Sequence, residues 1–148
     1  MSIIIEIDGK PVAKGRGRIG KLADGRATIF TPTATRQNEN LIKMAAMEAM
    51  GDRDPIEGAV EVFVHVYLAY PNASKKKLAE MVAGRIRPCT KPDIDNYVKS
   101  ALDGINTIVF KDDNQVVSLH AHKVYRSKPS MRIEVREIYQ PKAIEELI

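Results

Sequence analysis

The chain has 148 residues, a length that suits one domain with a single apolar core. Hydrophobic residues make up 44% and charged residues 28%, with a net charge of +4; these are ordinary values for a globular protein and only weakly indicate a nucleic-acid partner. No apolar run approaches the roughly 18 residues of a membrane span, no signal peptide is recognisable, and the single cysteine excludes an internal disulfide, so we predict a cytoplasmic protein.

Hydrophobic periodicity and the positions of Gly and Pro define the predicted elements. In chain order these are strands at 2–8 and 28–30, a helix at 33–50, a strand at 60–70, a short helix at 74–83, a helix from Asp95, and strands at 116–125 and 131–138. The order, roughly β-α-β-α-α-β-β, predicts an α+β domain over residues 1–148, with helices packed on a mixed sheet. Residues 10–26 are predicted to be a basic mobile loop, because their glycines disfavour a regular element, and residues 139–148 a frayed tail with one weak helical turn.

The first long helix is defined by its ends and its apolar spacing. Thr33 is the candidate N-cap, Gly51 follows the last turn, and Leu41 and Met44 mark the apolar side. The methionines of this helix are interpreted as packing residues rather than as a cofactor site.

Positive charge is concentrated in two segments. Residues 10–26 carry six basic side chains against one acidic, and residues 75–91 carry six more against one acidic. Either segment alone fits a solvated surface as well as a nucleic-acid contact. The candidates for DNA contact are Lys14, Arg16, Arg18, Lys21, Arg36, Lys75, Lys76, Lys77, Arg85, Arg87 and Lys91.

The most informative stretch is acidic. If residues 93 and 94 are extended, Asp93 and Asp95 point the same way, and two adjacent carboxylates favour a bound cation such as Mg²⁺. The alternative is that they only cap the following helix. Lys99 lies one helical turn after Asp95, where it can form a surface ion pair or stabilise charge on a phosphate.

A second acidic pair, Asp112 and Asp113, precedes the strand at 116–125. Asp is a common turn residue, so a turn is the simpler interpretation. If that strand lies beside the start of the Asp95 helix, Asp113 completes a three-carboxylate metal site. His120 and His122 face the same way on the strand, but without a third nitrogen or sulfur ligand we interpret them as structural or exposed. Gly15 and Gly17 lack the strand–helix context of a phosphate-binding loop, so no nucleotide cofactor is predicted.

These residues resemble a known family. Residues 91–103 read K-P-D-I-D-N-Y-V-K-S-A-L-D and residues 109–117 read V-F-K-D-D-N-Q-V-V, a pair that closely resembles the RusA-type Holliday junction resolvases of phages and prophages. The K-G-R-G-R at 14–18 and F-T-P-T-A-T-R at 30–36 are also similar to this family, and the resemblance runs from about Ile5 to Val135.

The resemblance implies an endodeoxyribonuclease that requires Mg²⁺, with Mn²⁺ as a substitute, and that acts as a homodimer on four-way DNA junctions in recombination and repair. It places metal ligands at Asp93, Asp95 and Asp113, with Asp112 as a less specific acidic position, and a catalytic lysine at Lys99. The chain departs from the family in two places: Pro92 stands where some members have a basic residue, and the basic segment at 75–87 is longer than in compact members.

Two rival functions are kept open. One is a less selective metal-dependent nuclease of branched DNA. The other is a non-catalytic basic DNA-binding protein whose aspartates are only caps and turns.

Overall fold

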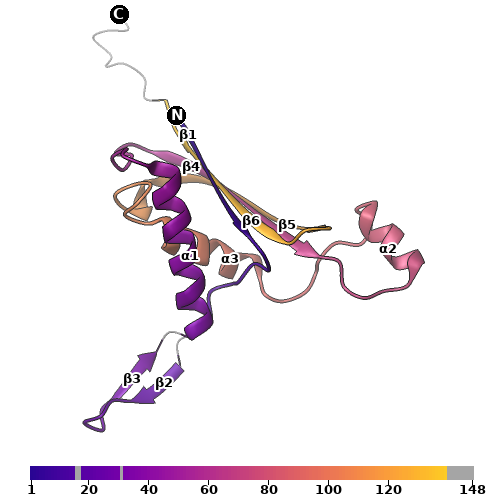
Figure 1. The fold of residues 1–148 in the computed structure, drawn as a ribbon, viewed down its shortest axis with the longest axis horizontal. Coiled ribbons are helices and arrows are strands. Elements are labelled where there is room, and N and C mark those ends of the chain that lie inside the picture. The colour runs from indigo at the N-terminus through magenta and orange to yellow at the C-terminus, as the bar shows by residue number, and fades with distance from the viewer. Residues whose placement is uncertain (16–17, 31, 140–148) are drawn as a thin grey trace, which may run out of the picture.

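A four-stranded mixed sheet with helices packed on one face forms the framework of the protein (Figure 1). The structure, a computed structural model, describes residues 1–15, 18–30 and 32–139, and it confirms the predicted α+β class. Its elements are β1 (Ser2–Asp8), β2 (Arg18–Lys21), β3 (Ala27–Phe30), α1 (Thr33–Met50), β4 (Val60–Ala69), α2 (Lys75–Val82), α3 (Ile94–Ile105), the 3-10 helix η1 (Asp113–Gln115), β5 (Val116–Arg126) and β6 (Ser130–Glu137).

The strand order in the main sheet is β1-β6-β4-β5. The last strand, β6, is antiparallel to both β1 and β4, whereas β4 and β5 are parallel. Alternate residues of β4 from Val60 to Val66 are fully buried against the helices. This period-2 burial matches the sequence pattern, because side chains alternate between the two faces of a strand. The parallel β4–β5 pair requires a long crossover, and α3 lies within that crossover.

The helices α1 and α3 pack closely because α3 has a glycine at the contact. A Cβ built on Gly104 would lie 2.4 Å from Ile42 Cγ2 and 2.6 Å from Ile42 Cβ, closer than real Cβ contacts. Both residues are buried. Gly104 therefore sets the distance between the two helices that carry one wall of the site described below.

We predict that Gly104→Ala lowers the free energy of unfolding by up to about 2 kcal/mol, because overpacking costs about 1–3 kcal/mol and the better helix propensity of Ala offsets about 1. Urea denaturation measures the effect. In an Ile42→Ala background the same substitution should cost less, since the clashing methyl groups are gone; an equal cost in both backgrounds would show that the contact does not matter.

The buried face of α1 differs from the predicted one. Leu41 and Met44 are 56% and 67% exposed, and the helix instead buries Ile42, Ala46 and Met50, at four-residue spacing. The buried face continues toward the start of the helix through Thr35 and Asn38. A search for apolar spacing could not find these two polar residues. The N-cap position is Pro32, so Thr33 is the first helical residue rather than the cap. Of the methionines at 44, 47 and 50, only Met50 packs in the core.

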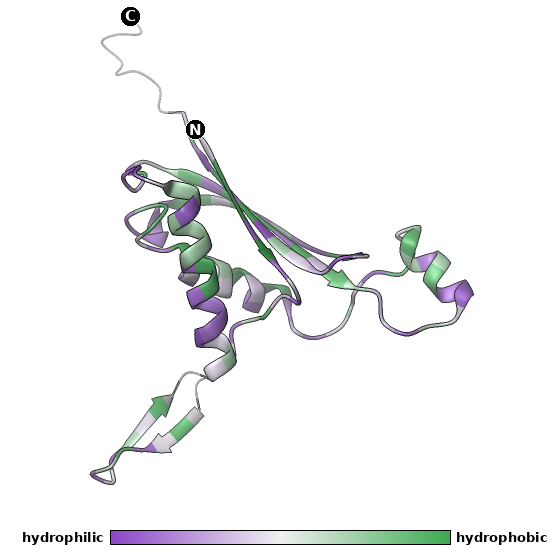
Figure 2. Ribbon diagram, in the orientation of Figure 1, coloured by the Kyte–Doolittle hydropathy of each residue, from purple (hydrophilic) through white to green (hydrophobic). Residues whose placement is uncertain are grey.

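The glycines of the basic segment at 10–26 predict a mobile loop, but the segment contains a strand. Its residues 18–21 form β2, which pairs antiparallel with β3 in a hairpin projecting beyond the start of α1 (Figure 1). The cross-strand hydrogen bonds outweigh the weak strand propensity of glycine, and Gly25 supplies the turn residue with φ of 87°. Hydrophobic residues occur on both strands of this hairpin (Figure 2). Ile19 and Ile29 are opposite one another in its register, and both are exposed.

The predicted helical turn and fraying of the tail fall on residues 140–148, outside the described part of the chain. In the described residues, no helix is long and apolar enough to cross a membrane.

Candidate active site

A surface hollow of about 340 Å³ lies at the N-terminus of α3. Its lining residues are Lys14, Gly15, Asp93, Asp95, Asn96 and Lys99. Three of the predicted site residues, Asp93, Asp95 and Lys99, therefore come together in one place, with Lys14 opposite them on the segment that follows β1. The hollow joins two aspartates and Lys99, the types of residue that hold a metal ion and a phosphate.

The carboxylate of Asp93 is not used as a helix cap. Asp93 occupies the N-cap position of α3 with an extended backbone, but its side chain makes no capping hydrogen bond. Asp95 lies in the first turn, and both residues are exposed. The capping alternative is thus not supported for Asp93, which leaves its oxygens free to bind a ligand.

Lys99 follows Asp95 by one turn, and no described residue forms an ion pair with it. The neighbouring acid, Asp103, instead contacts Lys14 Nζ. The charge of Lys99 is therefore available to an anion in the hollow.

The loop before Asp93 is held by Lys123 of β5, a residue that sequence reasoning missed. Its Nζ donates to the carbonyl oxygens of Thr90 at 2.8 Å and Pro92 at 3.1 Å. The Lys91–Pro92 peptide bond in this loop is cis. Lys123 is opposite Val66 in the β4–β5 register, so it stands on the face of β5 that also carries Leu119 and Ala121. A lysine on an otherwise apolar strand face was the available signal.

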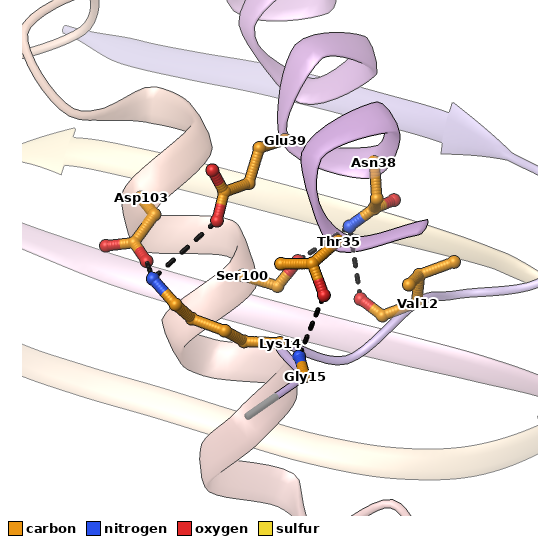
Figure 3. Close-up of polar contacts among 8 residues, drawn as sticks. All are labelled: Val12, Lys14, Gly15, Thr35, Asn38, Glu39, Ser100 and Asp103. Atoms are coloured by element: carbon orange, nitrogen blue, oxygen red, sulfur yellow. Dashed lines mark hydrogen bonds and ion pairs between the residues drawn. The ribbon is translucent and has the colours of Figure 1, made fainter. Parts of the chain in front are cut away.

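Lys14 has three contacts, and Figure 3 shows the two that its Nζ makes with Asp103 and Glu39. Its backbone N–H donates to Asn96 O at 2.9 Å, and its Nζ contacts Asp103 and lies 3.7 Å from Glu39 Oε1. The hydrogen bond with Asp103, aided by the charges of Asp103 and Glu39, raises the pKa of Lys14 above its ordinary value despite partial burial. The charge of Lys14 is therefore paired with the carboxylates of Asp103 and Glu39, and its main role is to hold the segment after β1 against α1 and α3.

Buried polar contacts join this wall to α1 and α3. Asn38 Nδ2 donates to Ser100 Oγ at 2.6 Å and to Val12 O at 3.1 Å, and the Gly15 N–H donates to Thr35 Oγ1 at 2.9 Å (Figure 3). These bonds explain why polar residues occupy the buried face of α1. They fix the segment that carries Lys14 against both helices.

Asp113 does not reach this hollow, contrary to the expectation that it lies beside Asp93 and Asp95 in one chain. Asp113 lies just before the start of β5, and Lys123 lies near the end of that strand. At about 3.3 Å per residue, Asp113 and Lys123 are roughly 30 Å apart. Lys123 contacts the loop before Asp93, so Asp113 is far from Asp93. No group of three or more His, Cys, Asp or Glu in residues 1–15, 18–30 and 32–139 is placed to hold a metal ion.

The turn at Asp112 and Asp113 is anchored by Gln115. Its Oε1 accepts from Asp112 N–H at 2.9 Å, and its Nε2 donates to Ile56 O at 2.7 Å and Gly58 O at 2.9 Å. The glutamine of this motif thus ties the acidic turn to the segment that enters β4. Both aspartates are exposed.

Comparison with known proteins identifies the chain. The family model described as endodeoxyribonuclease RusA matches residues 8–136, which include the whole site. The chain belongs to the RusA family of endodeoxyribonucleases. The uncharacterized protein YqaN of Bacillus subtilis (strain 168) is 36% identical to it over 133 residues, which cover 88% of this chain and 92% of YqaN. As a RusA-family protein, the chain is a DNA-acting nuclease.

The RusA-family assignment gives meaning to the distribution of basic residues. Five of the predicted DNA contacts are exposed and lie on the two projections in Figure 1, the β2–β3 hairpin and the α2 region beyond β4. Lys21 ends β2, and Lys75, Lys76 and Lys77 form the first turn of α2. Arg85 pairs with Glu80, so its charge is partly neutralised.

The other basic candidates lie nearer the main sheet of this RusA-family protein, or belong to residues whose side chains the structure does not describe. Arg36 is exposed in the first turns of α1, and Arg87 and Lys91 are exposed in the connector before α3. Arg16 is outside the described residues, and the backbone of Arg18 is in β2.

The two histidines lie on the sheet face opposite the helices. His120 Nε2 is 2.9 Å from Glu61 Oε1, and its ring stacks on Phe63. His122 Nε2 is 3.0 Å from His65 Nδ1. These contacts agree with the structural interpretation of the pair.

Proposed function

We propose that this RusA-family chain acts in the cytoplasm as a Mg²⁺-dependent, homodimeric endonuclease that resolves four-way DNA junctions in recombination and repair, with Mn²⁺ as a substitute ion. The observation that carries the proposal is the hollow in which Asp93, Asp95 and Lys99 meet. Each dimer would make two nicks, one per site.

The donor set fits Mg²⁺, which is commonly held by one or two carboxylates, water and substrate phosphate. Asp93 and Asp95 would be the ligands, and the Asp93 carboxylate is free because it makes no capping bond. When bound, the ion supplies Lewis-acid activation of water and neutralises phosphate charge. Lys99 would stabilise the negative charge that develops on the phosphate.

A second copy of the chain would complete the site. β5 is an edge strand of 11 residues, and Val117 and Leu119 on it are exposed. Two such strands related by a two-fold axis pair antiparallel, so the start of one lies beside the end of the other. This arrangement brings Asp113 of the second copy toward Asp93 and Asp95 of the first. The dimer then supplies the third carboxylate that one chain lacks.

The basic residues on the β2–β3 hairpin and on α2 would contact DNA phosphates on either side of the hollow. Contacts of this kind give affinity without sequence preference and weaken with salt. Lys91, two residues before Asp93, would hold the backbone next to the cleaved bond.

A synthetic four-way junction tests the proposal. We expect paired nicks near the branch point with Mg²⁺, none with EDTA, and much slower cleavage of a linear duplex of the same sequence. Equal cleavage of flaps, linear duplex and junction would instead support the less selective nuclease. Tight, salt-sensitive junction binding without cleavage in Mg²⁺ or Mn²⁺ would support the non-catalytic DNA-binding protein.

A further inference from the structure

A second hollow, of about 480 Å³, adjoins the candidate active site. It is lined by Lys10, Pro11, Leu68, Ala69, Tyr70, Pro71, Thr90, Lys91, Pro92, Tyr97, Tyr125 and Pro129. It shares two chain segments with the first hollow, the one after β1 and the one that begins α3. The two hollows are therefore neighbours on the surface: Pro92 lines the second hollow, and the next residue, Asp93, lines the first.

The position of this hollow in the fold favours ligand binding. It lies where the parallel strands β4 and β5 end, because Leu68 is opposite Tyr125 in their register. Crevices beyond the carboxyl ends of parallel strands are common ligand sites, since the connections diverge there. The crossover that leaves β4 and returns to β5 passes through Thr90 and Lys91, and Lys123 fixes it by the hydrogen bonds to Thr90 and Pro92.

The walls are flat and largely apolar. Tyr70 and Tyr125 have ring centroids 5.8 Å apart with planes inclined by 31°, and both rings are only partly buried. Tyr97, 1% exposed, contributes a buried wall, and four prolines complete the lining. Partly exposed tyrosine faces in such a hollow suit a planar aromatic ligand, which stacks with little cost in side-chain entropy.

The rim is positively charged. Lys10 and Lys91 are exposed at the edge of the hollow, and the lining contains no acidic residue. A planar ring inside and positive charge at the edge match a nucleotide, whose base is aromatic and whose phosphates are anionic.

We propose that this hollow receives one nucleobase, unstacked from the DNA beside the phosphate that lies at Asp93 and Asp95. The inference rests on the proposed function, because it takes branched DNA as the ligand. Unstacking costs least at a branch point, where base stacking is already interrupted. Tyr125 and Tyr70 replace the lost stacking, and Lys91 holds the adjacent backbone, so the nucleotide is fixed next to the carboxylates.

A double-mutant cycle between protein and DNA tests this pocket through binding alone, in EDTA. Four-way junctions are prepared with one abasic nucleotide at successive positions around the branch point, and their affinities are measured for wild type and for Tyr125→Leu. Stacking on an aromatic side chain contributes enough that we expect Tyr125→Leu to bind the intact junction about 10- to 100-fold more weakly. At one position, removal of the base should weaken junction binding by wild type by about the same factor as Tyr125→Leu does. The affinity of Tyr125→Leu for that abasic junction should equal its affinity for the intact junction.

Two variants control for loss of fold. Tyr125→Phe keeps the ring and should bind like wild type, whereas Tyr67→Leu, on the opposite face of the sheet, should leave the abasic profile unchanged. Equal weakening of intact and abasic junctions by Tyr125→Leu at every position would overturn the base pocket. Tyr125 lies on β5, the strand proposed to pair in the dimer, so affinities are compared at concentrations where mass measurement shows Tyr125→Leu to be dimeric. Since the readout needs no cleavage, failure of the nuclease assignment and failure of the pocket give different results.

Discussion

Asp95→Asn is expected to slow junction cleavage about 10²- to 10³-fold, the range seen when one preorganised electrostatic group is removed from an active site. The substitution keeps the side-chain size and removes the charge that would hold Mg²⁺ between Asp93 and Asp95. Asp95 is exposed in the first turn of α3, so the fold and junction binding should be nearly unchanged. Single-turnover cleavage of a labelled junction at saturating Mg²⁺ measures the effect.

The matched control is Asp52→Asn, which removes an exposed aspartate just beyond the far end of α1. It should cleave at the wild-type rate. Near-normal cleavage by Asp95→Asn under the same conditions would remove Asp95 from the metal site.

Two inactive variants should restore activity to one another. If each site combines Asp93 and Asp95 of one chain with Asp113 of the other, a heterodimer of Asp95→Asn and Asp113→Asn has one site with both substitutions and one intact site. Random exchange of subunits makes about half of the dimers heterodimeric, so nicking should return to about a quarter of the wild-type level. Each variant alone should be nearly inactive, so the nicking rate of the mixture should far exceed that of either variant.

The mixture is prepared by co-refolding and compared with Asp95→Asn mixed with the double variant Asp95→Asn/Asp113→Asn. That second mixture contains no chain with Asp95 and should stay inactive. If the first mixture is also inactive although mass measurement shows heterodimers, each chain builds its own site, and the β5 pairing is wrong.

The sequence predicted well what depends on local periodicity. The alternation in β1 and β4 and the helical spacing after Asp95 depend on neighbours within a few residues, so the elements were confirmed to within a few positions. The cluster of Asp93, Asp95 and Lys99 was predictable for the same reason, because all three lie at the start of one helix.

What the sequence could not predict depends on contacts between distant segments. The placement of Asp113 follows from the direction of β5, which is set by its parallel pairing with β4. The Lys14–Asp103 pair and the support from Lys123 join segments far apart in the chain, and the sequence does not name the partner of either lysine. The hairpin was missed because cross-strand bonding outweighed its glycines.

The position of β6 in the sheet has a consequence for folding. β6 is the last strand of the described residues, yet it lies between β1 and β4, and β1 has no other partner strand in the described sheet. The first and last strands must therefore meet, over a large sequence separation, before the sheet is continuous, which makes folding slow and cooperative. The segment that carries Lys14 follows directly from β1, so one wall of the candidate site depends on the placement of β6. In a chain that ends before β6, we therefore expect β1 and the segment with Lys14 to lose their place beside α3.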